Sequence, residues 1–116
     1  MLRIAAPLLM LAFFTPAIAG TPLADGFKKL TGPQIKKAFT GHQFSDEVHF
    51  RLYYKANGEI NGVEMGKKIT RKWRINNDQL CSGEGIKENC LFVWKKGSDV
   101  RLVIDDSDIS TDGKLQ

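Results

Sequence analysis

Two cysteines carry the strongest chemical signal in this sequence of 116 residues. Cys81 and Cys90 have eight residues between them, a distance that a hairpin loop can close. A redox pair more often has two intervening residues, and a zinc site needs two further ligands at suitable spacing. We therefore expect a structural disulfide, which for a loop of this size contributes roughly 2–3 kcal/mol by restricting the unfolded chain.

The other ionisable residues form no catalytic pattern. His42 and His49 are the only histidines and do not have the spacing of metal ligands. Glu84 and Glu88 lie in the loop between the cysteines, where glutamates more often keep a loop soluble than act as an acid–base pair. The serines lack the nucleophile motif of hydrolases. We predict a non-enzymatic protein with no cofactor and no metal.

One group of residues could instead form a binding surface. Alternation along the expected strands places several basic side chains and a tyrosine on one outward face of a sheet. Its members are Arg51, Tyr53, Lys72, Arg74 and Arg101. Such a face could bind an anionic envelope polymer or an acidic protein surface. The alternative is an ordinary solvated sheet face.

A second group of residues could line an interior pocket if the sheet closes on itself. Its members are the aromatic residues Phe50, Trp73, Phe92 and Trp94. The alternative is that these rings only fill the core of a small domain. The pocket would favour a small ligand carrier, whereas a filled core with a continuous basic face would favour binding of a macromolecule.

The first nineteen residues have the layout of a secretory signal peptide. A basic start that contains Arg3 precedes an apolar run, and Ala17-Ile18-Ala19 is a small-x-small cleavage site. The apolar run is too short for a membrane span, which needs about 20 residues; the alternative is a short anchoring helix. We therefore expect export to the periplasm or the exterior, with cleavage after Ala19 and no membrane span in the mature chain.

The charge of the mature chain argues against a nucleic-acid partner. The whole sequence has a formal net charge of +4, and removal of Arg3 with residues 1–19 leaves +3. A nucleic-acid binder is expected to carry a dense basic patch or stripe, which is not evident here. The length that remains after cleavage corresponds to a single domain.

A short helix is expected after a flexible leader at residues 20–29. Thr31 can cap the helix, and Gln34 completes a capping box. Apolar residues then recur at helical spacing, so that one side of the helix is buried. They are Ile35, Ala38 and Phe39. The helix is predicted to end at Gly41, a residue type favoured after a helix C-terminus.

The rest of the chain has the pattern of an antiparallel meander. Residues alternate between apolar and polar from Val48 to Tyr54, and Asn57-Gly58 is a strong hairpin signal. Further short strands follow, with turns predicted at 66–68, 76–78 and 96–98. We expect one mainly β domain over residues 30–104, followed by an acidic polar tail at 105–116. Its shape would be a curved sheet or small barrel with one short N-terminal helix.

Three segments in this order resemble a family of small exported proteobacterial proteins of unknown function. The segments are Leu30-Thr-Gly-Pro-Gln-Ile35 with Gly41, Tyr53-Tyr54 followed by Gly58, and Trp73-Arg-Ile75 with Leu80-Cys81 and Cys90. The resemblance covers residues 30–94 and implies a secreted domain with no established catalytic residues. One departure is that Arg71-Lys72-Trp73 has no glycine where the family has Gly-x-Trp.

Overall fold

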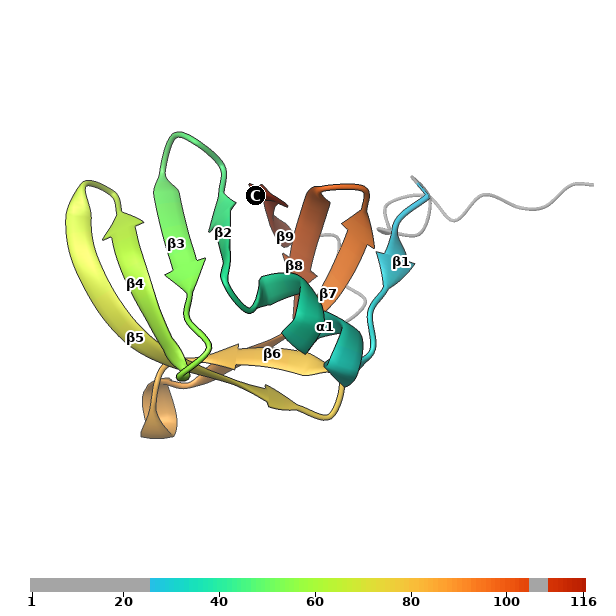
Figure 1. The fold of residues 1–116 in the computed structure, drawn as a ribbon, viewed down its shortest axis with the longest axis horizontal. Helices are drawn as coiled ribbons and strands as arrows, with labels where there is room; N and C mark the ends of the chain where they lie inside the picture. Colours follow the sequence, from blue (N-terminus) through green and yellow to red (C-terminus); the bar gives the residue numbers. More distant parts are fainter. Residues whose placement is uncertain (1–25, 105–108) are drawn as a thin grey trace, which may run out of the picture.

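The computed structural model describes residues 26–104 and 109–116, which form a closed eight-stranded antiparallel β-barrel (Figure 1). The strands of the ring are β2 (His42–Ser45), β3 (Phe50–Tyr54), β4 (Glu59–Glu64), β5 (Lys67–Asn76), β6 (Gln79–Ser82), β7 (Asn89–Lys96), β8 (Asp99–Val103) and β9 (Ser110–Leu115). Each strand pairs with the next in the chain, and β9 returns to pair with β2. The predicted mainly β meander with one short helix is confirmed, and the sheet closes.

The folded domain is longer at both ends than the sequence indicated. Phe27 is buried, and β1 (Lys28–Lys29) pairs with β7, so the last residues of the predicted leader belong to the fold. The predicted tail is also wrong in part, because β9 pairs with both β2 and β8. The expected signal peptide lies outside the described residues. No helix of the described part has the length and apolar character that crossing a membrane requires.

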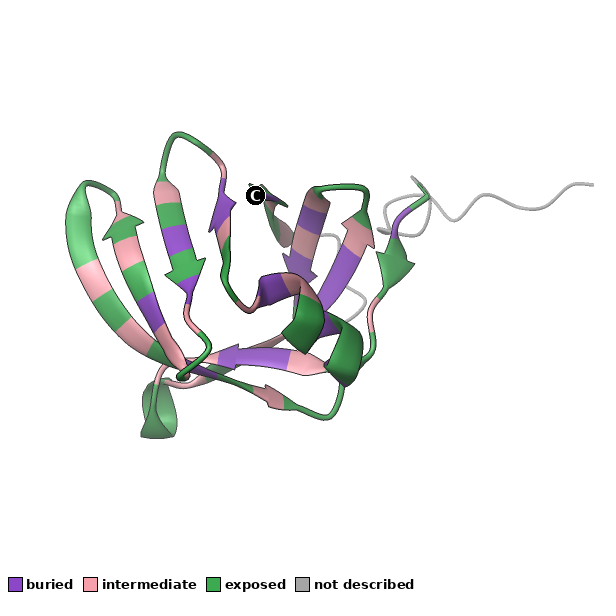
Figure 2. Cartoon of the chain, viewed as in Figure 1, coloured by how far each residue is buried: buried purple, intermediate pink, exposed green. Residues whose placement is uncertain are grey.

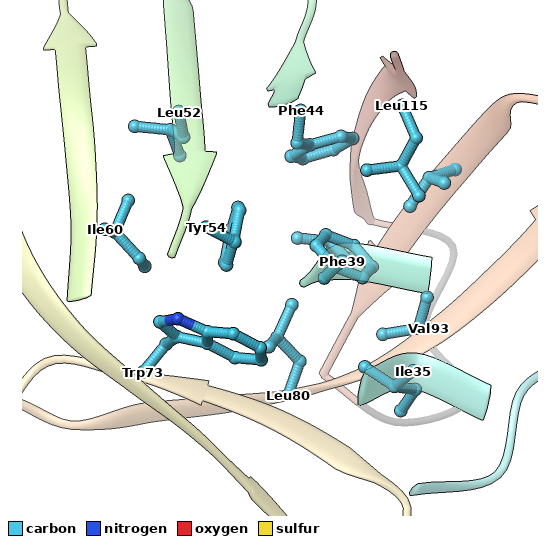
Figure 3. Packing of buried hydrophobic residues seen from close by; sticks show 12 residues of the cluster. Ile35, Phe39, Phe44, Leu52, Tyr54, Ile60, Trp73, Leu80, Val93 and Leu115 are labelled. Atoms are coloured by element: carbon cyan, nitrogen blue, oxygen red, sulfur yellow. The ribbon is translucent and has the colours of Figure 1, made fainter. Parts of the chain in front are cut away.

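Helix α1 (Gly32–Phe39) begins with the predicted capping box. The Thr31 hydroxyl accepts a hydrogen bond from the Gln34 backbone N–H at 3.4 Å, and the Gln34 side chain accepts one from the Thr31 N–H at 2.9 Å. Both bonds satisfy N–H groups that have no partner within the helix. The capped helix lies across the barrel and directs Ile35 and Phe39 into the interior (Figure 3).

The start of α1 is held against the turn between β5 and β6. The Gly32 backbone N–H donates a hydrogen bond to the Asp78 carboxylate at 2.7 Å. A Cβ atom at Gly32 would lie 2.1 Å from the Asn77 carbonyl oxygen, so a larger residue does not fit in this position. The glycine therefore allows the helix to approach the turn closely enough for its apolar side to enter the barrel.

The barrel interior is filled by side chains from the helix and from the strands (Figure 3). The Phe39 ring meets the ring of Tyr54 edge-on, with centroids 4.9 Å apart, and lies 5.9 Å from that of Phe44. Tyr54 in turn packs against Trp73 at 5.4 Å, and the indole N–H of Trp73 donates to the Lys55 carbonyl at 2.9 Å. These aromatic contacts tie α1 to one side of the ring of strands.

A second apolar cluster lies on the outside of the barrel. Phe27, Trp94 and Val103 are buried there, with Phe92 packed against them. The Lys29 ammonium lies 3.9 Å from the centre of the Phe92 ring. Cation–ring contacts of this kind stabilise an exposed site by about 0.5–1 kcal/mol. The cluster fastens the segment before α1 to the outer surface of β7.

The predicted aromatic pocket is therefore not assembled. Trp73 and Phe50 belong to the interior cluster, whereas Phe92 and Trp94 belong to the exterior one. Successive side chains of a strand point to opposite sides of a sheet. Because Val93 of β7 is part of the interior cluster, its two aromatic neighbours in sequence face outward. Figure 2 shows the same alternation of buried and exposed residues along several strands.

The predicted disulfide is confirmed. Cys81 of β6 and Cys90 of β7 are direct partners in the register and are bonded to each other. Glu88 lies close to the two sulfurs, and metal ligands have a similar spacing. Both sulfurs are consumed by the bond, however, and offer no thiolate to an ion.

Candidate binding faces

The outer surface of β3, β4 and β5 carries two rows of exposed side chains. In the first row, Arg51 is opposite Val63, which is opposite Lys68; in the second, Tyr53 is opposite Asn61, which is opposite Thr70. All six residues are exposed. We refer to these six residues as the β3–β5 face. It lies on strands whose inner sides are packed in the core, so its side chains start from fixed backbone positions.

The two charged residues of the β3–β5 face, Arg51 and Lys68, are both positive. Within residues 26–104 and 109–116, neither Arg51 nor Lys68 forms an ion pair. The strands that carry them are separated by one strand, which places their backbones about 10 Å apart. Tyr53 lies in the adjacent row with 45% of its surface exposed. The face thus combines an accessible aromatic ring with two cations that have no ion-pair partner in the described part of the chain.

Two other members of the predicted basic face are paired with acidic side chains of the loop between β6 and β7. Arg74 donates to both oxygens of Glu88, at 2.7 and 2.8 Å, and Lys72 lies 3.8 Å from Glu84. The hydrogen bonds from Arg74 lower the pKa of Glu88, which therefore remains ionised. Both cations are partly compensated, and Arg74 helps to hold the loop that follows Cys81.

Arg101 lies on a different side of the barrel. It belongs to β8, three strands beyond β5 in the order of the sheet, and not to the β3–β5 face (Figure 1). Its guanidinium lies 3.6 Å from the Asp112 carboxylate and 4.3 Å from the centre of the Phe27 ring. The prediction of a single face of five residues is therefore wrong. Arg51 and Tyr53 do share the outward side of the sheet, and Lys72 and Arg74 lie on the same outward side of β5 as Lys68 and Thr70.

Lys68 was missed from the face because the turn before β5 was placed too late. The sequence was interpreted as turning at 66–68, whereas the two residues between β4 and β5 are Met65 and Gly66. Both have positive φ values, 50° and 81°, as in the type I′ turns of tight hairpins. Counting back from a two-residue turn would have placed Lys68 on the strand, opposite Val63.

An ion pair is also present on the inner side of the same strands. Arg71 donates to Glu64, with one N–O distance of 2.9 Å, and both side chains are about one-third exposed. The hydrogen bond from Arg71 lowers the pKa of Glu64. Burial raises the pKa of the nearby Tyr54, which keeps its proton. Arg71 and Glu64 therefore pair as ions beside the protonated Tyr54 hydroxyl.

His49 has a structural partner in the loop between β2 and β3. Its ring nitrogen lies 2.7 Å from Asp46, whose other carboxylate oxygen accepts backbone N–H bonds from Val48, His49 and Phe50. Burial raises the pKa of Asp46, but the four hydrogen bonds outweigh it and hold the pKa well below its usual range. His49 and Asp46 therefore brace the loop that leads into β3.

Comparison of the chain with protein-family models, with curated proteins and with solved structures gives no match. The chemistry of its surfaces is therefore the basis for a functional assignment. Of the predicted site residues, Cys81 and Cys90 are bonded to each other, and Arg51 and Tyr53 share the β3–β5 face, whose two cations have no ion-pair partner among the described residues.

Proposed function

We propose that this protein is an exported, non-enzymatic binding domain whose β3–β5 face binds an anionic polymer of the cell envelope. The observation that carries the proposal is the pair of free cations, Arg51 and Lys68, in the row beside the exposed Tyr53 ring. The sheet fixes the backbone that carries these groups, so only their side chains have to be ordered when a ligand binds, which limits the entropy cost.

The chemistry of the face fits an acidic polysaccharide. Guanidinium and ammonium groups attract carboxylates or phosphates. The tyrosine ring offers an apolar surface with a polar edge. The amide of Asn61 and the hydroxyl of Thr70 can exchange hydrogen bonds with sugar hydroxyls. An acidic protein surface would use the cations but would have less use for the row of neutral polar groups.

Replacing Arg51 and Lys68 together with glutamine is expected to weaken binding to immobilised polygalacturonate, a carboxylated polysaccharide, about fivefold. Each exposed charge contact contributes roughly 0.2–1 kcal/mol, and tenfold in affinity corresponds to about 1.4 kcal/mol. The melting temperature should hardly change, because exposed substitutions of this kind cost within about 0.5 kcal/mol. Affinity chromatography with a salt gradient measures the first effect, and thermal unfolding measures the second.

The matched control removes two exposed lysines elsewhere, in the double variant Lys36→Gln and Lys87→Gln. It has the same net charge as the test variant and should retain wild-type affinity. Equal weakening in both variants would show that only net charge matters and would overturn the proposal. Retention on a column of polyglutamate but not of polygalacturonate would identify an acidic protein surface as the partner instead.

The arrangement of the aromatic rings does not favour the alternative, a ligand carrier with an interior aromatic cavity. The four rings proposed to line that cavity are divided between the inside and the outside of the barrel. The helix also places Ile35 and Phe39, both fully buried, among the interior side chains. No observation in the described interior favours a carrier over the binding face.

Export is expected to be accompanied by cleavage after Ala19. The basic start, the apolar run and the Ala-x-Ala site motivate this prediction. The disulfide supports it, because such bonds persist in oxidising compartments. N-terminal sequencing of the protein recovered from the periplasm or the medium should begin at Gly20. Recovery there of a chain that still begins at Met1 would contradict it.

A further inference from the structure

A groove runs between helix α1 and the closed wall of the barrel, with a volume of about 610 Å³. Its apolar lining comes from Leu30, Ala38 and Leu115, and its polar lining includes Lys37, Lys95 and Ser98. The volume lies in the range of small-molecule sites, about 300–1,000 Å³. The groove shares no residue with the β3–β5 face.

The groove is electrostatically one-sided. Its lining residues include two lysines and a histidine but no aspartate or glutamate. Neither Lys37 nor Lys95 has an ion-pair partner in the part of the chain that the structure describes. Ammonium groups beside an apolar surface attract an anion, and the low polarity of that surface strengthens the attraction.

The walls of the groove are held by the fold. The Leu30 backbone N–H donates to the Val93 carbonyl at 2.9 Å, which fixes the segment entering α1. The Leu115 N–H donates to the Ser98 carbonyl at 2.9 Å, which joins β9 to the turn between β7 and β8. The capping box holds the first turn of the helix. The site is thus formed before any ligand arrives, which favours binding.

We infer that this groove binds a small amphiphilic anion, a molecule with an aliphatic chain and a carboxylate or phosphate headgroup. The chain would lie on Leu30, Ala38 and Leu115, and the headgroup would be placed between the ammonium groups of Lys37 and Lys95. Burial of an aliphatic chain favours binding in proportion to the apolar surface that is removed from water. The charge complementarity of the rim selects an anion over a neutral or cationic amphiphile.

Three probes separate the contributions of the chain and the headgroup: decanoate, 1-decanol and acetate. Decanoate is expected to shift the backbone amide resonances of Ala38, Gly97 and Ser98 in a saturable titration. Decanol has the same chain length without the charge and should bind at least about fivefold more weakly, while acetate should produce no saturable shift. Equal affinity for decanoate and decanol, or decanoate shifts confined to other residues, would overturn the inference.

Two variants locate the site. Lys37→Gln with Lys95→Gln should reduce decanoate affinity about fivefold and leave decanol affinity unchanged. Ala38→Phe, which fills the groove, should abolish binding of both probes, with a thermal melt to verify folding. Lys36→Gln, on the same helix but outside the groove, serves as control. If the control weakens decanoate as much as the double lysine variant, or if both groove variants bind normally, the inference is wrong.

The groove and the β3–β5 face can be tested separately. The Lys37 and Lys95 variant should retain wild-type affinity for polygalacturonate, and the Arg51 and Lys68 variant should retain wild-type affinity for decanoate. Loss of both activities in either variant would contradict two independent sites. Failure of one proposal leaves the other to be decided by its own probe.

Discussion

Replacing Phe39 with alanine is expected to lower the free energy of unfolding by about 3–5 kcal/mol, the usual cost of removing a buried phenylalanine ring. Phe39 has none of its surface exposed and packs against the rings of Phe44 and Tyr54. Its loss leaves a cavity where the helix meets the strands, and rigid neighbours can collapse into it only in part. Since about 1 kcal/mol shifts the melting temperature of a small domain by 4–8 °C, the drop should exceed about 12 °C.

Lys36→Ala is the matched control for Phe39→Ala. Lys36 is on the same helix but is exposed, and alanine is a good helix former. Urea unfolding of both variants should show a large decrease in midpoint for Phe39→Ala and a change within about 0.5 kcal/mol for Lys36→Ala. Equal stability of the two variants would mean that the helix is not a structural part of the barrel core.

Gly62→Ala is expected to destabilise the protein by about 3 kcal/mol or more, at or above the upper end of the usual range for overpacking. A Cβ atom at Gly62 would lie 2.1 Å from the Arg51 carbonyl oxygen and 3.0 Å from the Leu52 Cα. Both contacts are with backbone, so β3 and β4 would have to separate where they pair. Alanine has the better intrinsic preference for a strand, so propensity alone predicts the opposite sign.

Asn61→Ala tests the same strand without the steric conflict. Asn61 is exposed on the outer surface and directly precedes Gly62. Its replacement should change the free energy of unfolding by no more than about 0.5 kcal/mol. Chemical denaturation of both variants measures the difference. A Gly62→Ala protein with the stability of the wild type would show that β3 and β4 are not as close at this point as described.

The local hairpins could be predicted from the sequence because each is specified by neighbouring residues. Asn57-Gly58 lies in the turn between β3 and β4, and the alternation from Phe50 to Tyr54 gives the correct buried side of β3. The disulfide could be predicted for the same reason, because Cys81 and Cys90 belong to consecutive strands. Signals of this kind lie within about ten residues of the feature that they specify.

Closure of the barrel could not be predicted, because the two strands that close it have weak patterns. β2 has four residues, and β9 is mostly polar with Leu115 as its one large apolar residue. In β9 the acidic and polar residues face solvent, while Leu115 is paired with Phe44 of β2. Nothing near either segment indicates its partner, so β9 was interpreted as part of a tail.

Only the part of the candidate site that lies on a single strand could be predicted from the sequence. Period-two alternation correctly placed Arg51 and Tyr53 on one surface, since both belong to one strand. It could not show that Arg74 meets Glu88 or that Arg101 is on another side of the barrel, because both depend on contacts between distant strands and loops. The groove beside α1 depends on five separate segments and has no local signature.

The pairing of β2 with β9 has a consequence for the order of events during synthesis. Leu115 follows Phe44 by 71 residues, so β2 is made long before its second neighbour exists. The hairpins between β2 and β9 can form early and independently. The pairing of β2 with β9, in contrast, has the full entropy cost of closing the long loop between these two strands. A nascent chain therefore remains an open ribbon until β9 emerges. An unclosed ribbon can pass through a narrow channel more easily than a closed barrel, which would suit the export proposed above.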